Sequence, residues 1–391
     1  MKMSENCNKR GWWTKYSEDR LIEVESKILT VLKSAYKTWF VSIGSTIGKD
    51  DQIWTIALND QAQNTPLVML HGFAAGLGFW CLNLDDIAKD RPVYAIDLIG
   101  FGRSSRPSFA KDCDTAEQQW ISALEAWRKQ LELDKFILLG HSFGGYLATS
   151  YAMSYPDRVK HLILADPWGF SEKPANIQPR TWVKVLGVVL YPLTYFNPLA
   201  TVRAVGPFGP WLVRKLRSDI SNRYEDAFED KHIITEYIYH CNSQYPSGES
   251  AFHTFLKGFG YAKNPMITRY DKLHDHIPIT VVYGEKSWIT KDPGYVLKDK
   301  KKYVNIEIIP RAGHHLYSDE PKIFNEIVRK TCKLSEDPDT IVQNFGDSNS
   351  STRILKHIVV SHDTLTSETV HFEDEEIIEF SEDSNTHITP Q

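Results

Sequence analysis

Short apolar runs recur along the chain and alternate with stretches of helical patterning, such as residues 115–131. The runs are rich in Val, Ile and Leu without strict apolar–polar alternation, as is typical of strands buried on both faces of a sheet. Strands that alternate with helices predict an α/β fold with a mostly parallel sheet flanked by helices. The predicted strands lie in QIWTIAL from residue 52, PLVMLHG from 66, RPVYAIDL from 91, FILLG from 136, HLILAD from 161, PITVVYG from 278 and NIEIIP from 305.

The alternation stops between Phe170 and about His276, where aromatic residues, prolines and helical patterns are common and no clear strand is present. We therefore predict a core in two parts, residues 37–170 and 277–333, with a helical cap at 171–276 inserted between them. After Lys333 the chain turns polar and acidic, which predicts a disordered tail at 334–391 because such a segment buries too little apolar surface to fold.

The net charge of −5 argues against a nucleic-acid partner. The five cysteines are scattered and form no Cys/His cluster, so we expect neither a metal nor another cofactor. The N-terminus lacks the apolar core of a secretory signal, which predicts a cytoplasmic location.

Two stretches concentrate apolar surface although no run is long enough to span a bilayer. One is residues 181–196, interrupted by Pro192, where either interfacial helices or a buried helix pair fits the pattern. The other holds Trp12 and Trp13 in the N-terminal segment 1–36. Neighbouring tryptophans cannot both face one core from a regular helix, but both can lie at a lipid surface. We predict that they anchor the protein there, with packing against the core as the alternative.

Ser142 stands in GHSFG, directly after the apolar run FILL and before a helical pattern. A G-x-S-x-G sequence between a strand and a helix is typical of a nucleophilic serine, because the glycines permit a sharp turn that exposes the hydroxyl. The helix that follows favours negative charge near its N-terminus. We predict that Ser142 is a nucleophile and that the N–H groups of Phe143 and Phe73 form an oxyanion hole.

A serine nucleophile needs a base, and the expected chain order is serine, acid, histidine. His314 follows the last predicted strand, where that base belongs, and its neighbour His315 is expected to be a packing residue. His314 and Asp319 also have the H-x₄-D spacing of some acyltransferases, in which Asp319 would orient the imidazole. The alternative, which we favour, is that Asp319 caps the helix that begins near Pro321.

Several stretches together resemble the α/β-hydrolase domain-containing 4 and 5 subfamily: HGFAAGLGFW, DLIGFGRSSRP, LLGHSFGGYLATSYAMSYPDRVKHLILADPWGF, YHCNSQYPSGESAF and GHHLYSDEP. The resemblance runs from about Gly11 to Lys333. It implies an α/β-hydrolase core with a helical cap, acting in glycerolipid metabolism at lipid droplets and membranes. It also implies that Lys286 and Gly313 contact a partner lipase, since the co-activator branch is similar at those positions.

One position departs from the family. The acid of the family lies in a WID stretch, but YGEKSWITKD places Thr290 there. Asp292, two residues later, is our first choice for the acid, and Asp166 after the run LILA is the second. The third alternative is that the site has no acid.

The resulting hypothesis is a serine hydrolase or acyltransferase that acts on lysophospholipids, N-acyl phospholipids or lysophosphatidic acid. The alternative is a co-activator that promotes lipolysis by a triacylglycerol lipase, with little catalysis of its own. In either case we expect a peripheral protein on lipid droplets, or on the surface of the mitochondrial or endoplasmic-reticulum membrane.

Overall fold

The computed structural model describes residues 17–174, 199–204, 206–258 and 260–336. Within them eight strands form one sheet in the order β1-β2-β4-β3-β5-β6-β9-β10. From β4 onward in this order neighbouring strands pair in parallel, whereas β2 pairs antiparallel with both β1 and β4. The mostly parallel sheet is therefore confirmed. The strands are β1 (Tyr36–Gly44), β2 (Asp51–Leu58), β3 (Leu67–Leu70), β4 (Val93–Ile96), β5 (Phe136–His141), β6 (Val159–Ala165), β9 (Ile279–Gly284) and β10 (Val304–Ile309).

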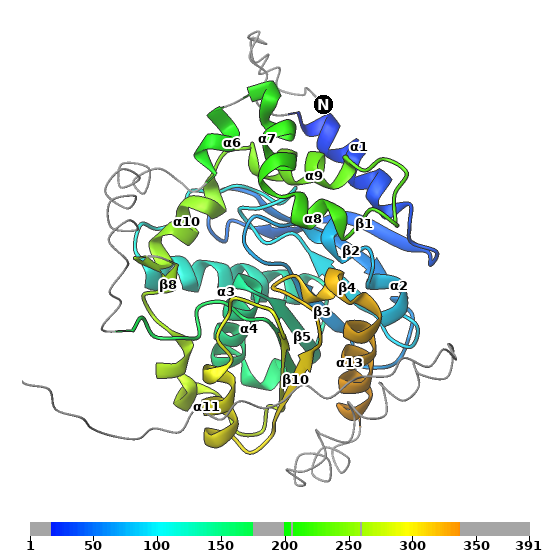
Figure 1. Cartoon of the computed structure of the whole chain (residues 1–391). Helices are drawn as coiled ribbons and strands as arrows, with labels where there is room; N and C mark the ends of the chain where they lie inside the picture. The colour runs from blue at the N-terminus through cyan, green and yellow to red at the C-terminus, as the bar shows by residue number, and fades with distance from the viewer. Residues whose placement is uncertain (1–16, 175–198, 205, 259, 337–391) are drawn as a thin grey trace, which may run out of the picture. The chain divides into compact units, whose positions relative to one another are not determined.

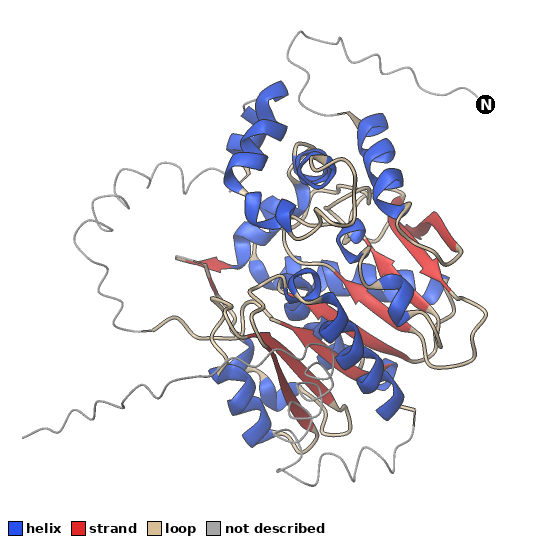
Figure 2. Ribbon diagram, turned by 45° about the vertical axis from the view of Figure 1, so that its right-hand side comes forward, coloured by secondary structure: helices blue, strands red, loops and turns tan. Residues whose placement is uncertain are grey.

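Helices cover both faces of the sheet (Figure 2). Phe136 and Leu138 of β5 pack on one face with α3 (Cys113–Gln130) and α4 (Phe143–Ser154). Ile137 and Leu139 point to the other face, which α1 (Glu18–Leu29) and α13 (Pro321–Leu334) cover. Because successive strand residues face opposite sides, a continuous apolar run such as FILL serves two cores at once. The shorter helices of the core are α2 (Leu84–Ile87), α11 (Asp292–Lys300) and α12 (Leu316–Asp319).

Within the eight-stranded sheet, β1 is the strand that the sequence did not predict. It lies at the edge of the sheet and pairs only with β2. Its burial is incomplete, with Val41 and Ile43 buried and Ser42 exposed. The apolar run is therefore short and interrupted, and pairing with β2 stabilises the strand more than its own composition does.

Helix α1 belongs to the packed structure rather than to a lipid surface. Leu21, Val24 and Ile28 are buried, and the indole of Trp54 donates a hydrogen bond of 2.8 Å to the buried Glu25. The predicted surface segment 1–36 is thus wrong for its second half, because α1 buries its apolar stripe against the core. Trp12 and Trp13 lie outside the described residues.

The insertion between β6 and β9 is mainly helical in its described part. Its helices α6 to α9 gather beside α1 (Figure 1). A short antiparallel pair, β7 (Leu256–Lys257) with β8 (Tyr261–Ala262), follows the last helix. The apolar stretch 181–196 lies outside the described residues. The helices are α6 (Ala200–Ala204), α7 (Gly209–Leu216), α8 (Ser218–Asn222), α9 (Ile233–Asn242) and α10 (Ser247–Phe255).

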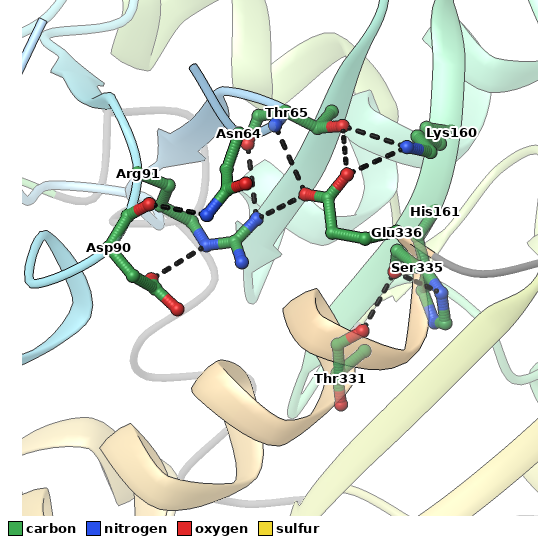
Figure 3. A network of polar contacts seen from close by, with 9 residues as sticks. All are labelled: Asn64, Thr65, Asp90, Arg91, Lys160, His161, Thr331, Ser335 and Glu336. Atoms are coloured by element: carbon green, nitrogen blue, oxygen red, sulfur yellow. Dashed lines mark hydrogen bonds and ion pairs between the residues drawn. The ribbon is translucent and has the colours of Figure 1, made fainter. Parts of the chain in front are cut away.

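A polar network ties the end of α13 to the sheet (Figure 3). The Glu336 carboxylate accepts hydrogen bonds from the backbone and hydroxyl of Thr65, from Arg91 at 2.9 Å and from Lys160 at 2.9 Å. Arg91 is almost wholly buried, so its charge needs this partner. Residues 334–336 therefore belong to the folded core, and the predicted tail begins too early. Residues 337–391 lie outside the described part of the chain.

Candidate active site

Ser142 sits at the turn between β5 and α4 with φ of 54° and ψ of −117°, a backbone conformation that non-glycine residues rarely adopt. The turn is tight enough that a Cβ on Gly140 would lie 2.3 Å from the carbonyl oxygen of Gly144. A Cβ on Gly144 would lie 2.5 Å from the carbonyl oxygens of Leu70 and His71. The two glycines of G-x-S-x-G are thus required by close backbone contacts on both sides of the serine.

His314 lies in the loop after β10 and reaches back to the serine. Its Nε2 is 3.0 Å from Ser142 Oγ, and its Nδ1 is 2.6 Å from Asp166 Oδ2. A carboxylate only accepts hydrogen bonds, so Nδ1 carries the proton and Nε2 is left to accept from the serine hydroxyl. Serine, histidine and aspartate form one continuous chain of hydrogen bonds.

Asp166 follows β6 directly and is fully buried. It also accepts hydrogen bonds from the hydroxyl of Ser287 and, at 3.3 Å, from the N–H of Gly284. These contacts fix the carboxylate from β9, the strand next to β6. The backbone of Asp166 has φ of 46°, a strained conformation that the packed loop maintains.

The first choice for the acid, Asp292, is wrong in this structure. Asp292 is exposed at the start of α11 and accepts a hydrogen bond of 3.0 Å from the hydroxyl of Thr290. Proximity in sequence to the WID position favoured Asp292, but α11 begins at that residue and keeps its carboxylate at the helix N-terminus. The second choice, Asp166, is the residue that contacts His314.

The two predicted oxyanion donors lie on either side of the serine turn. Phe143 is the first residue of α4, and Gly72 before Phe73 is so close that a Cβ there would lie 3.0 Å from Ser142 Cβ. In the described part of the chain neither the Phe73 nor the Phe143 N–H donates a hydrogen bond. Both donors are therefore available to an oxygen held beside Ser142.

Two further histidines support the turn. His141 Nε2 donates a hydrogen bond of 2.8 Å to the carbonyl oxygen of His314, which ties the histidine loop to β5. Burial lowers the pKa of His141 well below its usual value, and it lowers the pKa of His71 to about 4. Both imidazoles are neutral near pH 7, so neither adds positive charge next to His314.

His315 is a packing residue, as its sequence position predicted. Its ring lies 5.5 Å from the ring of His141 and 5.9 Å from that of Tyr317. Arg217 at the start of α8 lies 3.3 Å from its Nε2. Burial is the main cause that lowers the pKa of His315 well below its usual value, and the positive charges of Arg223 and Arg217 act in the same direction.

Asp319 has neither of the two predicted roles. It does not contact the His314 imidazole, and α13 begins after Glu320 with no side-chain cap. One oxygen instead accepts a hydrogen bond of 2.8 Å from the Gly313 N–H, and the other forms an ion pair with Arg223, next to α8. Asp319 therefore fixes the backbone beside His314 and joins it to the cap.

Lys286 and Gly313 lie on adjacent loops. The N–H of Lys286 donates a hydrogen bond of 2.8 Å to the carbonyl oxygen of Ala312, and the Lys286 side chain is exposed. Both residues are thus close to His314 without belonging to its hydrogen-bond chain.

Among the described residues no helix could cross a membrane, and no cluster of side chains could hold a metal ion. The fold and the chain of hydrogen bonds from Asp166 to Ser142 define the class of α/β-hydrolases. A family model described as "alpha/beta hydrolase fold" matches residues 65–186. A crystal structure of naproxen esterase from Bacillus subtilis has the same fold, with a TM-score of 0.56 and 19% identity over 80% of this chain and 97% of that one.

Curated relatives are much more similar in sequence. The human (lyso)-N-acylphosphatidylethanolamine lipase is 44% identical over 81% of this chain and 92% of its own length. The rat 1-acylglycerol-3-phosphate O-acyltransferase ABHD5 is 46% identical over 81% of this chain and 90% of its own. The chain belongs to the α/β-hydrolase family that contains these two proteins.

Proposed function

We propose that the protein is a serine hydrolase or acyltransferase of glycerophospholipid metabolism, with Ser142 as nucleophile, His314 as base and Asp166 as the acid that orients it. The observation that carries the proposal is the continuous hydrogen-bond chain from Asp166 through His314 to Ser142. A buried carboxylate on one imidazole nitrogen and a serine hydroxyl on the other is the arrangement that activates a serine.

In the first half of the reaction Ser142 Oγ attacks the carbonyl carbon of a fatty acyl ester or amide while His314 Nε2 takes the hydroxyl proton. The N–H groups of Phe73 and Phe143 stabilise the negative charge on the carbonyl oxygen. When the tetrahedral intermediate collapses, His314 returns the proton to the leaving oxygen or nitrogen. The acyl group remains on Ser142 as an ester.

In the second half an acceptor O–H gives its proton to His314 and attacks the acyl carbon. The bond to Ser142 then breaks, and Ser142 Oγ recovers the proton. Water as acceptor completes hydrolysis, and the hydroxyl of a lysophospholipid completes acyl transfer. The names of the two relatives support this pair of outcomes, since one is a lipase and the other an acyltransferase.

A fluorophosphonate probe tests the proposal, because it labels only an activated serine. We expect labelling of the wild type and none of Ser142→Ala or His314→Ala. Ser108→Ala and His276→Ala, at exposed positions, are matched controls and should be labelled like the wild type. Equal labelling of the Ser142→Ala protein would refute the proposal.

The substrates that we propose are lysophospholipids, N-acyl phospholipids and lysophosphatidic acid, as the names of the two relatives suggest. Incubation of the purified protein with a panel of these lipids, followed by mass spectrometry of products, tests this choice. Release of fatty acid from one lipid class and its absence with Ser142→Ala would support it. Turnover restricted to short, soluble esters would contradict it.

A second candidate function is activation of a triacylglycerol lipase at a surface beside the active site. The exposed Lys286, next to the loop that holds Gly313, favours this function because a partner can reach both. We expect Lys286→Glu to abolish activation of the lipase while fluorophosphonate labelling of Ser142 continues. Unchanged activation would remove this candidate.

A lipid-droplet or membrane surface is the proposed place of action. Support comes from α7, where Trp211 and Leu216 are exposed and Phe208 precedes the helix, also exposed. Lys215 lies over the Trp211 ring at 6.0 Å. Exposed aromatic and aliphatic side chains beside lysine suit the headgroup region of a lipid surface.

A further inference from the structure

A cleft of about 220 Å³ opens between the loops that follow β6 and β9. Its floor is apolar: Trp168, Phe170 and Ile289 are buried, and the indole N–H of Trp168 is occupied by a hydrogen bond of 2.7 Å to the carbonyl oxygen of Gly260. Ser171 and Thr290 are polar residues of the lining. None of the residues to which the proposed reaction assigns a role lines this cleft.

The cleft lies next to the catalytic residues. Its lining begins at Pro167, directly after Asp166. Trp288 also lines it, and the Trp288 ring centroid lies 5.0 Å from that of His314. Trp288 is 68% exposed, so its ring is accessible to a molecule bound in the cleft.

The order of strands places the cleft on one side of the nucleophile. Strand β3, which leads to Gly72 and Phe73, pairs with one edge of β5. Strands β6, β9 and β10, which lead to Asp166, Trp288 and His314, lie beyond the other edge of β5. The carbonyl oxygen of a bound acyl group is held on the β3 side, so the cleft lies on the side of the imidazole.

The chemistry then decides which part of the substrate reaches the cleft. The leaving oxygen of an ester must receive its proton from His314 Nε2, and an accepting hydroxyl must give its proton to the same atom. Whatever is attached to that oxygen therefore lies beside His314 and Trp288. We infer that the cleft binds the hydrocarbon chain on the alcohol side of the ester, that is, the chain of the leaving or accepting lysolipid rather than the acyl chain on Ser142. This inference rests on the proposed function.

Such a site would also favour a lipid acceptor over water. An acceptor whose chain occupies the cleft holds its hydroxyl next to His314 Nε2, and the same chain excludes water from the imidazole. The Trp288 side chain, which joins the cleft to His314, would be a specificity residue with no direct part in proton transfer.

Isomeric esters test the inference. Hexyl acetate and ethyl hexanoate contain the same atoms, but the long chain is on the alcohol side in the first and on the acyl side in the second. Each methylene that enters an apolar cleft raises kcat/KM by up to about fourfold. We expect kcat/KM of the wild type to rise along the series butyl, hexyl and octyl acetate, and Trp288→Ala to flatten that rise. The matching series of ethyl esters should be unaffected by Trp288→Ala.

Ser171→Trp, which fills the cleft from its rim, should also flatten the alkyl acetate series. Trp211→Ala is the matched control, because Trp211 is similarly exposed at 52% but lies on α7 of the cap. Because these substrates are used as dissolved monomers, differences in binding to lipid surfaces do not affect the comparison. If Trp288→Ala instead flattens the rise of kcat/KM along the ethyl ester series, the cleft binds the acyl chain. If the rise is unchanged in both series, the cleft has no role in binding. Either result overturns the inference.

A binding measurement separates this inference from the proposed function. In the Ser142→Ala protein, which performs no acyl chemistry, a brominated long-chain alcohol should quench the fluorescence of the two tryptophans of the cleft, Trp168 and Trp288. The quenching should be reduced in Ser142→Ala with Trp288→Phe, because only Trp168 then remains in the cleft. Unreduced quenching in the second protein would contradict the inference, whereas failure of fluorophosphonate labelling in the wild type would contradict the proposed function alone.

Discussion

Asp166 accepts a hydrogen bond of 2.6 Å from His314 Nδ1, although the two residues are 148 positions apart in the chain. The same Asp166 oxygen accepts a hydrogen bond from the Ser287 hydroxyl. The loop after β9 therefore helps to hold the carboxylate in the orientation that contacts the imidazole. We propose Asp166 as the orienting residue because of its position in space, although Asp292 lies closer in sequence to the place of the family's acid.

We predict that Asp166→Asn lowers kcat by about 10⁴-fold, because an amide in this place favours the wrong imidazole tautomer. Asp292→Asn should change kcat little, since Asp292 contacts Thr290 at the start of α11. Turnover of a soluble ester by both purified variants is the measurement. Equal losses in the two variants would argue that neither carboxylate orients His314.

Asp319→Asn should destabilise the protein and lower hydrolysis and acyl transfer together. Asparagine can accept from the Gly313 N–H, but its amide group then faces the Arg223 guanidinium, donor against donor. We expect a loss of about 1–3 kcal/mol in the free energy of unfolding, measured by denaturant titration. Glu320→Gln, which removes an exposed ion pair with Arg311, should cost well under about 1 kcal/mol and is the control. Selective loss of acyl transfer at unchanged stability would restore the H-x₄-D interpretation.

Two glycine substitutions near the site should have opposite outcomes. Gly144→Ala would place a Cβ 2.5 Å from two backbone carbonyl oxygens, which cannot move without shifting β3, so we expect a loss of about 1–3 kcal/mol or more in stability and little activity. Gly313→Ala meets only Asp319 Oδ2 at an ordinary 3.5 Å and should fold normally. The measurement is the melting temperature of each variant, which should fall for Gly144→Ala and stay at the wild-type value for Gly313→Ala. Normal folding also makes Gly313→Ala a clean probe of the proposed lipase-activating surface.

The network around Glu336 predicts a pH dependence of stability. Partial burial alone would raise the pKa of this carboxyl, but hydrogen bonds from Lys160, Thr65 and Arg91 lower it from 4.5 to about 2. Since the folded pKa is the lower one, the stabilisation is complete above about pH 4.5 and is lost as the pH falls toward 2. Glu336→Gln should reduce the slope of melting temperature against pH between those limits. Glu326→Gln, an exposed residue of α13, should keep the slope of the wild type. A slope unchanged by Glu336→Gln would show that the network does not couple to folding.

Trp12→Ala with Trp13→Ala should release the protein from lipid droplets while its melting temperature and soluble-ester turnover change little. Each indole brings about 150–250 Å² of apolar surface to a lipid interface, enough for reversible attachment. Co-flotation with artificial droplets measures the effect. If droplet binding survives and Trp211→Ala removes it instead, attachment lies on the cap at α7.

Local sequence was sufficient for much of the framework. Apolar residues predominate in strands β2 to β6, β9 and β10, and burial on both faces of a sheet leaves few other ways to place such runs. Ser142 was recognisable because the strained turn needs Gly140 and Gly144 on either side of it, and these three residues lie within five positions of the sequence. The fold class, and Ser142 as the nucleophile that we propose, could therefore be predicted before any contact was known.

Contacts between distant segments decided the rest. Edge strand β1 depends on β2 as its partner, and α1 is core rather than surface because the sheet and the cap cover its apolar stripe. The sequence favoured Asp292 over Asp166 as the acid, and only the order β6-β9-β10 in the sheet brings Asp166 to His314. The role of Asp319 likewise depends on its ion pair with Arg223, which lies 96 residues away in the chain. A hydrogen bond requires atoms to meet within about 3 Å, and spacing along the chain determines that distance only within a single turn or helix.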